Sequence, residues 1–257
     1  MRSTMLNHCL RLAPLLACVA AAPVLADEAP ITPYRPSVSS PAQLPAVGQL
    51  EYEAGLLSTR TDDARRNSLP ILFKLAFSES WGVLLGGEAF VSAPDGVHRA
   101  RGLGDTSVVL KHALVIDSET AFGLELGAKV PTAKDSIGSG KADYSLNTIF
   151  SKDLGKVHMD ANANVVRLGV AEPDSSRTQT GLSASFSTPV NARWGVTGEL
   201  SGTRRSGAAS TAQVLVAAAY SPNKQATIDL GVAHGLNKAS PDWSLFTGVV
   251  IALGKLW

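Results

Sequence analysis

Polar side chains that could bind a ligand recur at every second position in one stretch of this sequence. Residues 157–168 carry His158, Asp160, Asn162 and Asn164. Side chains at i and i+2 of a strand share a face, so the imidazole and the carboxylate could hold a metal ion or contact a ligand. One histidine with one carboxylate is a thin ligand set, and the same ladder fits a hydrated polar wall. We favour the wall and expect no metal and no cofactor.

A second group of charged residues falls on three successive predicted strands. Glu88, Lys111 and Glu125 lie at similar distances from short turns, which predicts a cross-strand Glu–Lys–Glu network. Such a network could hold the strand register, or it could form a gate or a cation-preferring constriction. We favour the structural role, and Lys129 joins the set as a further residue of the same face.

Two patterns that resemble catalytic or nucleotide-binding motifs are incomplete. The run Gly138-Ser139-Gly140-Lys141 has Asp135 where a phosphate loop needs glycine and Ala142 where it needs serine or threonine. A lipid-cleaving barrel enzyme needs a Ser–His pair on its lipid-facing wall, and no His-x-Ser triplet occurs in the sequence. We therefore predict that the protein is not an enzyme.

Alternating polarity indicates that β-strands position these residues. In Ala121–Val130 apolar residues alternate with glycine or charged residues, and Asp143–Asp153 and Val157–Leu168 repeat the pattern. Period two is the signature of a strand with one apolar and one polar face. Strands of about ten residues, joined alternately by short turns and longer loops, are typical of strands that cross an outer membrane.

Extended to the whole chain, the pattern predicts an all-β fold, a single antiparallel transmembrane β-barrel of about twelve strands. The apolar faces would contact lipid, the polar faces would line the lumen, and aromatic residues at strand ends would form an interfacial girdle. Longer loops are expected at Arg60–Asn67 and Ser92–Leu103, among others. The predicted strands are Gln49–Thr59, Ser68–Ser78, Trp81–Val91, Gly104–Ile116, Ala121–Val130, Asp143–Asp153, Val157–Leu168, Arg177–Ser187, Trp194–Thr203, Thr211–Tyr220, Ala226–His234 and Trp243–Trp257.

Residues 1–26 have the features of a cleaved secretory signal peptide. A basic start precedes the apolar run Leu12–Ala22, and Val24-Leu25-Ala26 is a small-x-small cleavage site. A lipoprotein box at Leu15–Cys18 is the less favoured alternative. Because Cys9 and Cys18 both lie in this segment, the mature chain would have no disulfide and no cysteine-bound metal.

Residues 27–48 are rich in proline and lack periodicity, which predicts an extended periplasmic arm. A plug is the alternative, although about twenty residues without secondary structure would make a poor one. Residues 49–257 are then the outer-membrane barrel. The prolines are Pro30, Pro33, Pro36, Pro41 and Pro45.

From Gly102 to Gly169 the chain resembles the outer-membrane transporters linked to the meta-cleavage pathway of phenol degradation. The matching runs are Gly102–Asp105, Lys129–Thr132, Gly138–Tyr144 and Ser151–Gly155. The resemblance implies an outer-membrane barrel that transports aromatic or other apolar small molecules. It carries over no substrate-binding residues.

These observations predict a passive channel for small apolar or aromatic molecules in the outer membrane of a Gram-negative cell. A structural or adhesive barrel with a closed lumen and a lipid-modifying enzyme are the alternatives. Acids outnumber bases on the polar faces, so we expect weak cation preference. Without residues 1–26 the chain has 21 basic and 22 acidic residues, which gives no attraction to nucleic acid.

The expected macromolecular partners are those of an outer-membrane protein. Basic residues in the outer loops, such as Arg65 and Arg99, would contact lipid and lipopolysaccharide phosphates or, less favoured, attract anionic solutes. The last predicted strand ends at the aromatic residue Trp257, which resembles the signal that the barrel assembly machinery reads.

Overall fold

The computed structural model describes residues 29–62 and 64–257, so the predicted signal peptide lies outside the described residues. Within them the chain is all β, and no helix is long and apolar enough to cross a membrane. The strands are β1 (Gln49–Thr61), β2 (Ala64–Ala76), β3 (Trp81–Asp95), β4 (His98–Gly102), β5 (Thr106–Val115), β6 (Thr120–Val130), β7 (Asp143–Leu154), β8 (Val157–Arg167), β9 (Thr178–Pro189), β10 (Trp194–Arg205), β11 (Thr211–Asn223), β12 (Ala226–Gly235) and β13 (Trp243–Lys255).

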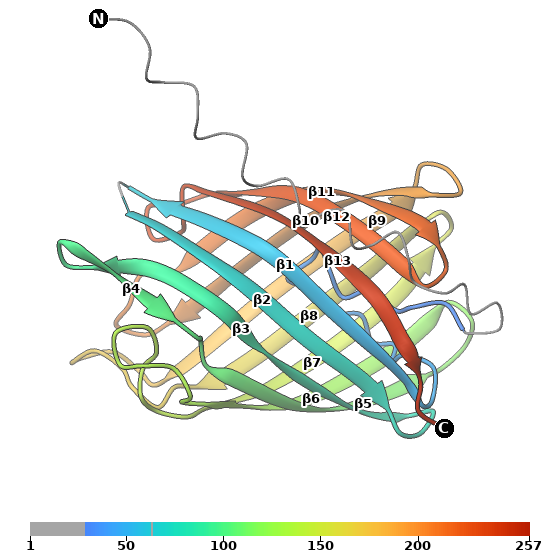
Figure 1. Ribbon diagram of the computed structural model, residues 1–257, viewed down its shortest axis with the longest axis horizontal. Helices are drawn as coiled ribbons and strands as arrows, with labels where there is room; N and C mark the ends of the chain where they lie inside the picture. Colours follow the sequence, from blue (N-terminus) through green and yellow to red (C-terminus); the bar gives the residue numbers. More distant parts are fainter. Residues whose placement is uncertain (1–28, 63) are drawn as a thin grey trace, which may run out of the picture.

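These strands form one closed antiparallel barrel (Figure 1). Each strand pairs with its neighbours in the chain, and β1 pairs with β13, which joins the first strand to the last. The short β4 pairs only with the outer half of β3, whereas β5 pairs with the inner half. Twelve strands therefore close the barrel, as the sequence predicted, and such a sheet has no free edge.

The alternation along each strand separates an outer apolar surface from an inner polar one. Across β5 and β6, Lys111 lies opposite Glu125 and both are buried inside the barrel. One position along, Leu110 lies opposite Leu126, and these side chains are 39% and 53% exposed. Exposed apolar side chains recur in this way around the barrel, and water does not favour so large an apolar belt. The belt matches the hydrocarbon region of a bilayer.

Aromatic pairs mark both ends of this belt. Each pair joins neighbouring strands at a turn or loop, with ring centroids 4.3–5.0 Å apart. Rings of this kind are favoured at the level of lipid headgroups. The pairs are Trp81–His112, Trp194–Tyr220 and His234–Trp243.

Short turns gather at one end of the barrel and longer connections at the other, as expected. Two predicted loops are wrong, because they are hairpins. β1 and β2 stay paired as far as Thr61 and Ala64, in place of a loop at Arg60–Asn67. β3 continues to Asp95 and turns into β4, in place of a loop at Ser92–Leu103. Cross-strand hydrogen bonds thus extend the wall beyond the lipid belt.

Residues 29–48, which we call the plug segment, lie inside the barrel near the end that holds the C-terminus (Figure 1). They hydrogen-bond inward-facing side chains of β1, β2, β5, β7, β8, β10 and β12. The predicted periplasmic arm at 27–48 is therefore wrong for the residues that the structure describes. The barrel wall supplies the partners that the segment's own backbone lacks.

Candidate functional site: the lumen and its plug segment

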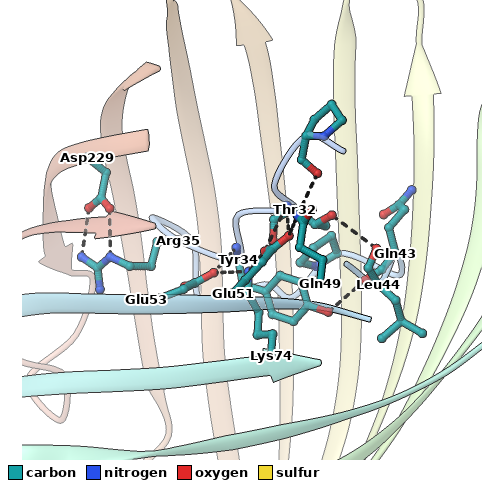
Figure 2. A network of polar contacts seen from close by, with 12 residues as sticks. Thr32, Tyr34, Arg35, Gln43, Leu44, Gln49, Glu51, Glu53, Lys74 and Asp229 are labelled. Atoms are coloured by element: carbon teal, nitrogen blue, oxygen red, sulfur yellow. Dashed lines mark hydrogen bonds and ion pairs between the residues drawn. The ribbon is translucent and has the colours of Figure 1, made fainter. Parts of the chain in front are cut away.

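Carboxylates of β1 hold the beginning of the plug segment. The backbone N–H of Thr32 donates to Glu51 at 3.0 Å, and that of Tyr34 donates to Glu53 at 2.8 Å. A proline-rich segment forms no ladder of its own, so its N–H groups need partners from elsewhere when they are buried. Glu51 and Glu53 supply them, as Figure 2 shows.

Lys74 of β2 neutralises these two carboxylates. Its Nζ lies 3.0 Å from Glu51 and 2.5 Å from Glu53, and it also donates to the carbonyl oxygen of Thr32. The Lys74 side chain is completely buried. A buried ammonium is costly unless it is paired and hydrogen-bonded, and here every partner comes from β1 or the plug segment. The cluster therefore ties the segment to the wall.

Tyr34 is the central anchor of the plug segment. Its ring lies beneath two ammonium groups, Lys74 Nζ at 4.3 Å and Lys111 Nζ at 4.2 Å from the centroid. Its hydroxyl donates to the carbonyl oxygen of Gln43 at 2.9 Å, which folds the segment back on itself (Figure 2). Cation–π contacts strengthen when water is excluded, and Tyr34 is buried.

The predicted Glu–Lys–Glu network is half right. Lys111 pairs with Glu125 at 3.0 Å and donates to the carbonyl oxygen of Pro41 at 2.5 Å. Glu88 does not join them, because the β3–β5 register places Lys111 opposite Gly82. Glu88 lies farther toward the outer end and accepts two hydrogen bonds from Arg66, at 2.8 and 2.6 Å.

The predicted polar ladder of β8 faces the lumen. His158 is hydrogen-bonded to Asp153 at 2.5 Å and to Asp160 at 3.2 Å. Farther along the strand, Asn162 accepts a hydrogen bond from the plug segment. Asn164 lines a cavity beyond it. The described residues contain no group of three or more His, Cys, Asp or Glu side chains placed to hold a metal ion. Whether the ladder touches a solute stays a prediction.

Lys129 lies at the outer rim, apart from the Lys111 pair. Its Nζ lies 2.9 Å from Asp105 and 3.0 Å from Asp143, and it donates to Ser139 at 2.9 Å. Asp105 also accepts from the backbone N–H of Ala133 at 3.0 Å. Partial burial raises the pKa of Asp105, but hydrogen bonds from Lys129 and Ala133 outweigh it and hold the pKa below its usual value. The cluster fixes the loop between β6 and β7.

Arg35 forms the second anchor of the plug segment. Its guanidinium makes two hydrogen bonds to Asp229 of β12, at 2.8 and 2.9 Å (Figure 2). Gly55 makes room for it, because a Cβ there would lie 2.7 Å from the guanidinium carbon. A bidentate arginine–carboxylate pair is both strong and geometrically specific.

Residues 38–42 of the plug segment are held by β10, β8 and β7. The N–H groups of Val38 and Ser39 donate to Glu199 Oε2 at 2.8 and 2.9 Å. Ser40 exchanges two hydrogen bonds with Asn162, at 2.8 and 2.9 Å. Farther along, the N–H of Ala42 donates to Ser151 Oγ at 2.8 Å.

Two cavities flank residues 38–42. The outer cavity has a volume of about 230 Å³ and is lined by Val38, Asn164, Ser183 and Ser201, with loop residues before β13. The inner cavity, of about 330 Å³, is lined by plug-segment residues including Ser39, together with Asp160, Ser185 and Thr197. Both cavities adjoin β8, β9 and β10.

Sequence reasoning placed the lining side chains on the correct face but missed what most of them bind. The excess of acids over bases inside the lumen was the available signal. Carboxylates buried without bases need other donors, and backbone N–H groups of a proline-rich segment can provide them. The positions of residues 29–48 depend on contacts with the barrel wall, so the sequence of the segment alone does not predict them.

The fold and the lumen define the class: an outer-membrane-type β-barrel with its N-terminal segment inside. The chain belongs to the family described as "Putative MetA-pathway of phenol degradation", whose model matches residues 35–253. This agrees with the resemblance seen in the sequence. No curated protein gives a significant match.

Solved outer-membrane barrels share the architecture. The COG4313 outer membrane channel from Pseudomonas putida F1 is 14% identical, with a TM-score of 0.67, over 87% of this chain and 100% of that chain. The KdgM porin is 11% identical, with a TM-score of 0.56, over 80% and 99%. The NanC porin is 10% identical, with a TM-score of 0.55, over 79% and 100%. At these identities the likeness shows the fold alone.

Proposed function

We propose that this protein resides in the outer membrane and is a passive channel for small molecules, with apolar or aromatic solutes as its cargo. The observation that supports this most is the pair of cavities inside a closed barrel, divided by part of a segment that hydrogen bonds hold against the wall. The proposed mechanism is diffusion down a gradient, without a covalent step.

The family and the solved barrels also support a channel function. Two of the structural neighbours are described as porins and one as a channel. A twelve-stranded barrel lies between small barrels filled by side chains and large porins with a water-filled channel. A plug segment that occupies part of the lumen suits a narrow, selective passage.

The test is solute flux into proteoliposomes, with ion currents in planar bilayers. We expect sugars of one ring, small aromatic acids or both to enter measurably faster than into protein-free liposomes, with weak cation preference. Clear anion selectivity would reject the cation preference alone. Liposomes that exclude aromatic acids and sugars alike would reject the channel.

A closed structural or adhesive barrel is the second candidate, because the plug segment fills much of the inner end of the lumen. It predicts no flux and no current in the same assay. Release of fatty acid from phospholipid, abolished by a His→Ala change, would instead indicate the third candidate, a lipid-modifying enzyme.

A further inference from the structure

The two cavities follow one another along the same wall. On β9 the outer cavity is lined by Ser183 and the inner by Ser185; on β10 the outer is lined by Ser201 and the inner by Thr197. Because inward-facing residues alternate, these positions form one column running from the outer to the inner end of the barrel. The opposite wall, on β1 and β2, is filled by the Lys74 cluster.

A thin partition separates the cavities. Val38 contacts the outer cavity and Ser39 the inner one, so the boundary is the backbone between adjacent residues. It is held by two hydrogen bonds to Glu199 and two between Ser40 and Asn162. Each such bond contributes only about 0.5–3 kcal/mol, so a small shift of this part of the segment is accessible.

Polar atoms at the partition retain unused hydrogen-bonding capacity. Glu199 Oε1 and Ser39 Oγ have no partner within the described residues, although these residues are only 3% and 1% exposed. At the edge of the outer cavity, Asn147 Oδ1 is likewise buried and unpartnered in that part of the chain. Buried polar atoms are rarely left unbonded. Asn147 lines the outer cavity and Ser39 the inner one, whereas Glu199 lines neither and lies behind the partition, where it accepts from the N–H groups of Val38 and Ser39. Free acceptors on both sides of the partition point to a ligand that donates hydrogen bonds.

The outer cavity defines the size and charge of that ligand. A cavity of about 150 Å³ holds a benzene ring, and this one measures about 230 Å³. No ionisable side chain lines it: its polar groups are the amides of asparagine and glutamine and the hydroxyls of serine and threonine. A charged solute would lose its hydration there without gaining a counter-charge.

We infer that solutes pass along the β8–β10 wall, and that an uncharged, single-ring molecule crossing the partition is bound through its hydroxyl groups by Asn147 on the outer side and Ser39 on the inner side. This inference rests on the proposed channel function and narrows its cargo. Ring carbons lie against Val38 and Pro241, while hydroxyls reach the free acceptors. An aromatic ring with hydroxyls and a pentose share this chemistry, and the experiments below distinguish them.

The path is tested with single cysteines, since Cys9 and Cys18 are the chain's only cysteines and both precede residue 27. Ser183→Cys places a thiol in the column, and Phe186→Cys places one on the lipid face of the same strand, where Phe186 is 47% exposed. Each purified protein is labelled with a bulky methanethiosulfonate, checked by mass and reconstituted. Labelling at 183 should reduce arabinose flux at least fivefold, and labelling at 186 should not change it.

The possible outcomes distinguish failure of the proposed path from failure of the proposed channel function. If the unlabelled protein passes no solute, the channel function fails. If it passes arabinose and labelling at 183 leaves the flux intact, the channel stands and the path is wrong. Ser→Cys changes one atom, and labelling follows folding, so loss of flux cannot be ascribed to misfolding.

The ligand chemistry is tested by block of the ion current. Resorcinol carries two hydroxyls on one ring, and 1,3-dimethoxybenzene is the matched ring without hydrogen-bond donors. We expect resorcinol to block at concentrations at least tenfold lower, and arabinose to block more weakly than resorcinol if the ring is aromatic. The Ser39 hydroxyl has no hydrogen-bond partner among the described residues, so Ser39→Ala leaves the attachment of the plug segment intact and should weaken block by resorcinol threefold to tenfold. Equal block by both rings, or stronger block by benzoate or benzylamine, would overturn the inference.

Discussion

The inner wall of this barrel has two unlike regions. On β1–β6 the lumen carries charges in pairs: Lys74 with Glu51 and Glu53, and Lys111 with Glu125. On the outer halves of β7–β11 the wall carries uncharged amides and hydroxyls beside open volume. The first region binds the beginning of the plug segment and is filled, whereas the second leaves the outer cavity open. The difference indicates that charge on β1–β6 serves attachment, whereas neutral polar groups line the outer part of the route.

The largest effect is expected where the charged region is broken. Lys74→Met leaves two buried carboxylates without their cation, and losing one partner of a buried ion pair costs about 3–5 kcal/mol. The free energy of unfolding, measured by urea titration in lipid vesicles, should fall by that amount. The matched control is Lys152→Met, whose partly exposed pair with Glu119 should contribute about 0–1 kcal/mol. Equal losses would show that the attachment is not specific.

A second substitution loosens the plug segment from its own side. Tyr34→Ala removes the ring beneath Lys74 and Lys111, at a cost of about 3 kcal/mol for a buried aromatic residue. Residues 29–48 should become sensitive to protease and the channel conductance should rise severalfold. Tyr34→Phe keeps the ring and loses only the bond to Gln43, so it should cost about 0.5–1.5 kcal/mol. A conductance unchanged in the alanine variant would contradict the plugging role.

Lowering the pH tests the Asp105–Lys129 cluster at the outer rim of the barrel. The pKa of Asp105 is lowered in the folded protein, so its contribution is present above the unfolded pKa of about 4 and is lost as the pH falls through the lower folded value. Loop 131–142 should therefore exchange amide hydrogens unchanged from pH 7 to 5 and loosen only below about pH 4. Asp105→Asn should loosen the loop at pH 7 and remove the pH dependence. Loosening between pH 7 and 5 in the unchanged protein would assign it to another group.

The smallest effect on stability is expected in the neutral region. Asn164 lines the outer cavity, so Asn164→Ala should change the free energy of unfolding by less than about 0.5 kcal/mol. Flux of a hydroxylated solute should still change, because the lining loses one amide. A stability loss as large as that of Lys74→Met would erase the contrast between the two regions.

The sequence predicted the fold because each strand carries its own evidence. Alternation in Ala121–Val130 fixes which side faces inward, and the Lys111–Glu125 pair follows from neighbouring strands of equal register. Glu88 could not be placed, because counting from turns ignores the register between β3 and β5, which sets Lys111 opposite Gly82 and leaves Glu88 farther toward the outer end. Registers depend on hydrogen bonds along the whole pair.

The plug segment was mispredicted for a different reason. Its composition is that of a linker, and nothing local favours a buried position. It is held by side chains more than a hundred residues away: Glu199 accepts from its backbone, and Asp229 accepts from the Arg35 side chain. Only the closed barrel brings those groups within reach of Arg35 and Val38, so the local sequence pattern does not predict the contacts.

The most direct test of this account is a disulfide between the plug segment and the wall. The backbone N–H of Ala42 lies 2.8 Å from Ser151 Oγ on β7, so Ala42→Cys and Ser151→Cys together should oxidise readily in the outer membrane. The account predicts a nearly complete cross-link, seen as a reduction-sensitive shift on a gel, with reduced ion current. A pair that stays reduced, with the thiol at 42 open to reagents in the periplasm, would place the segment outside the barrel and contradict it.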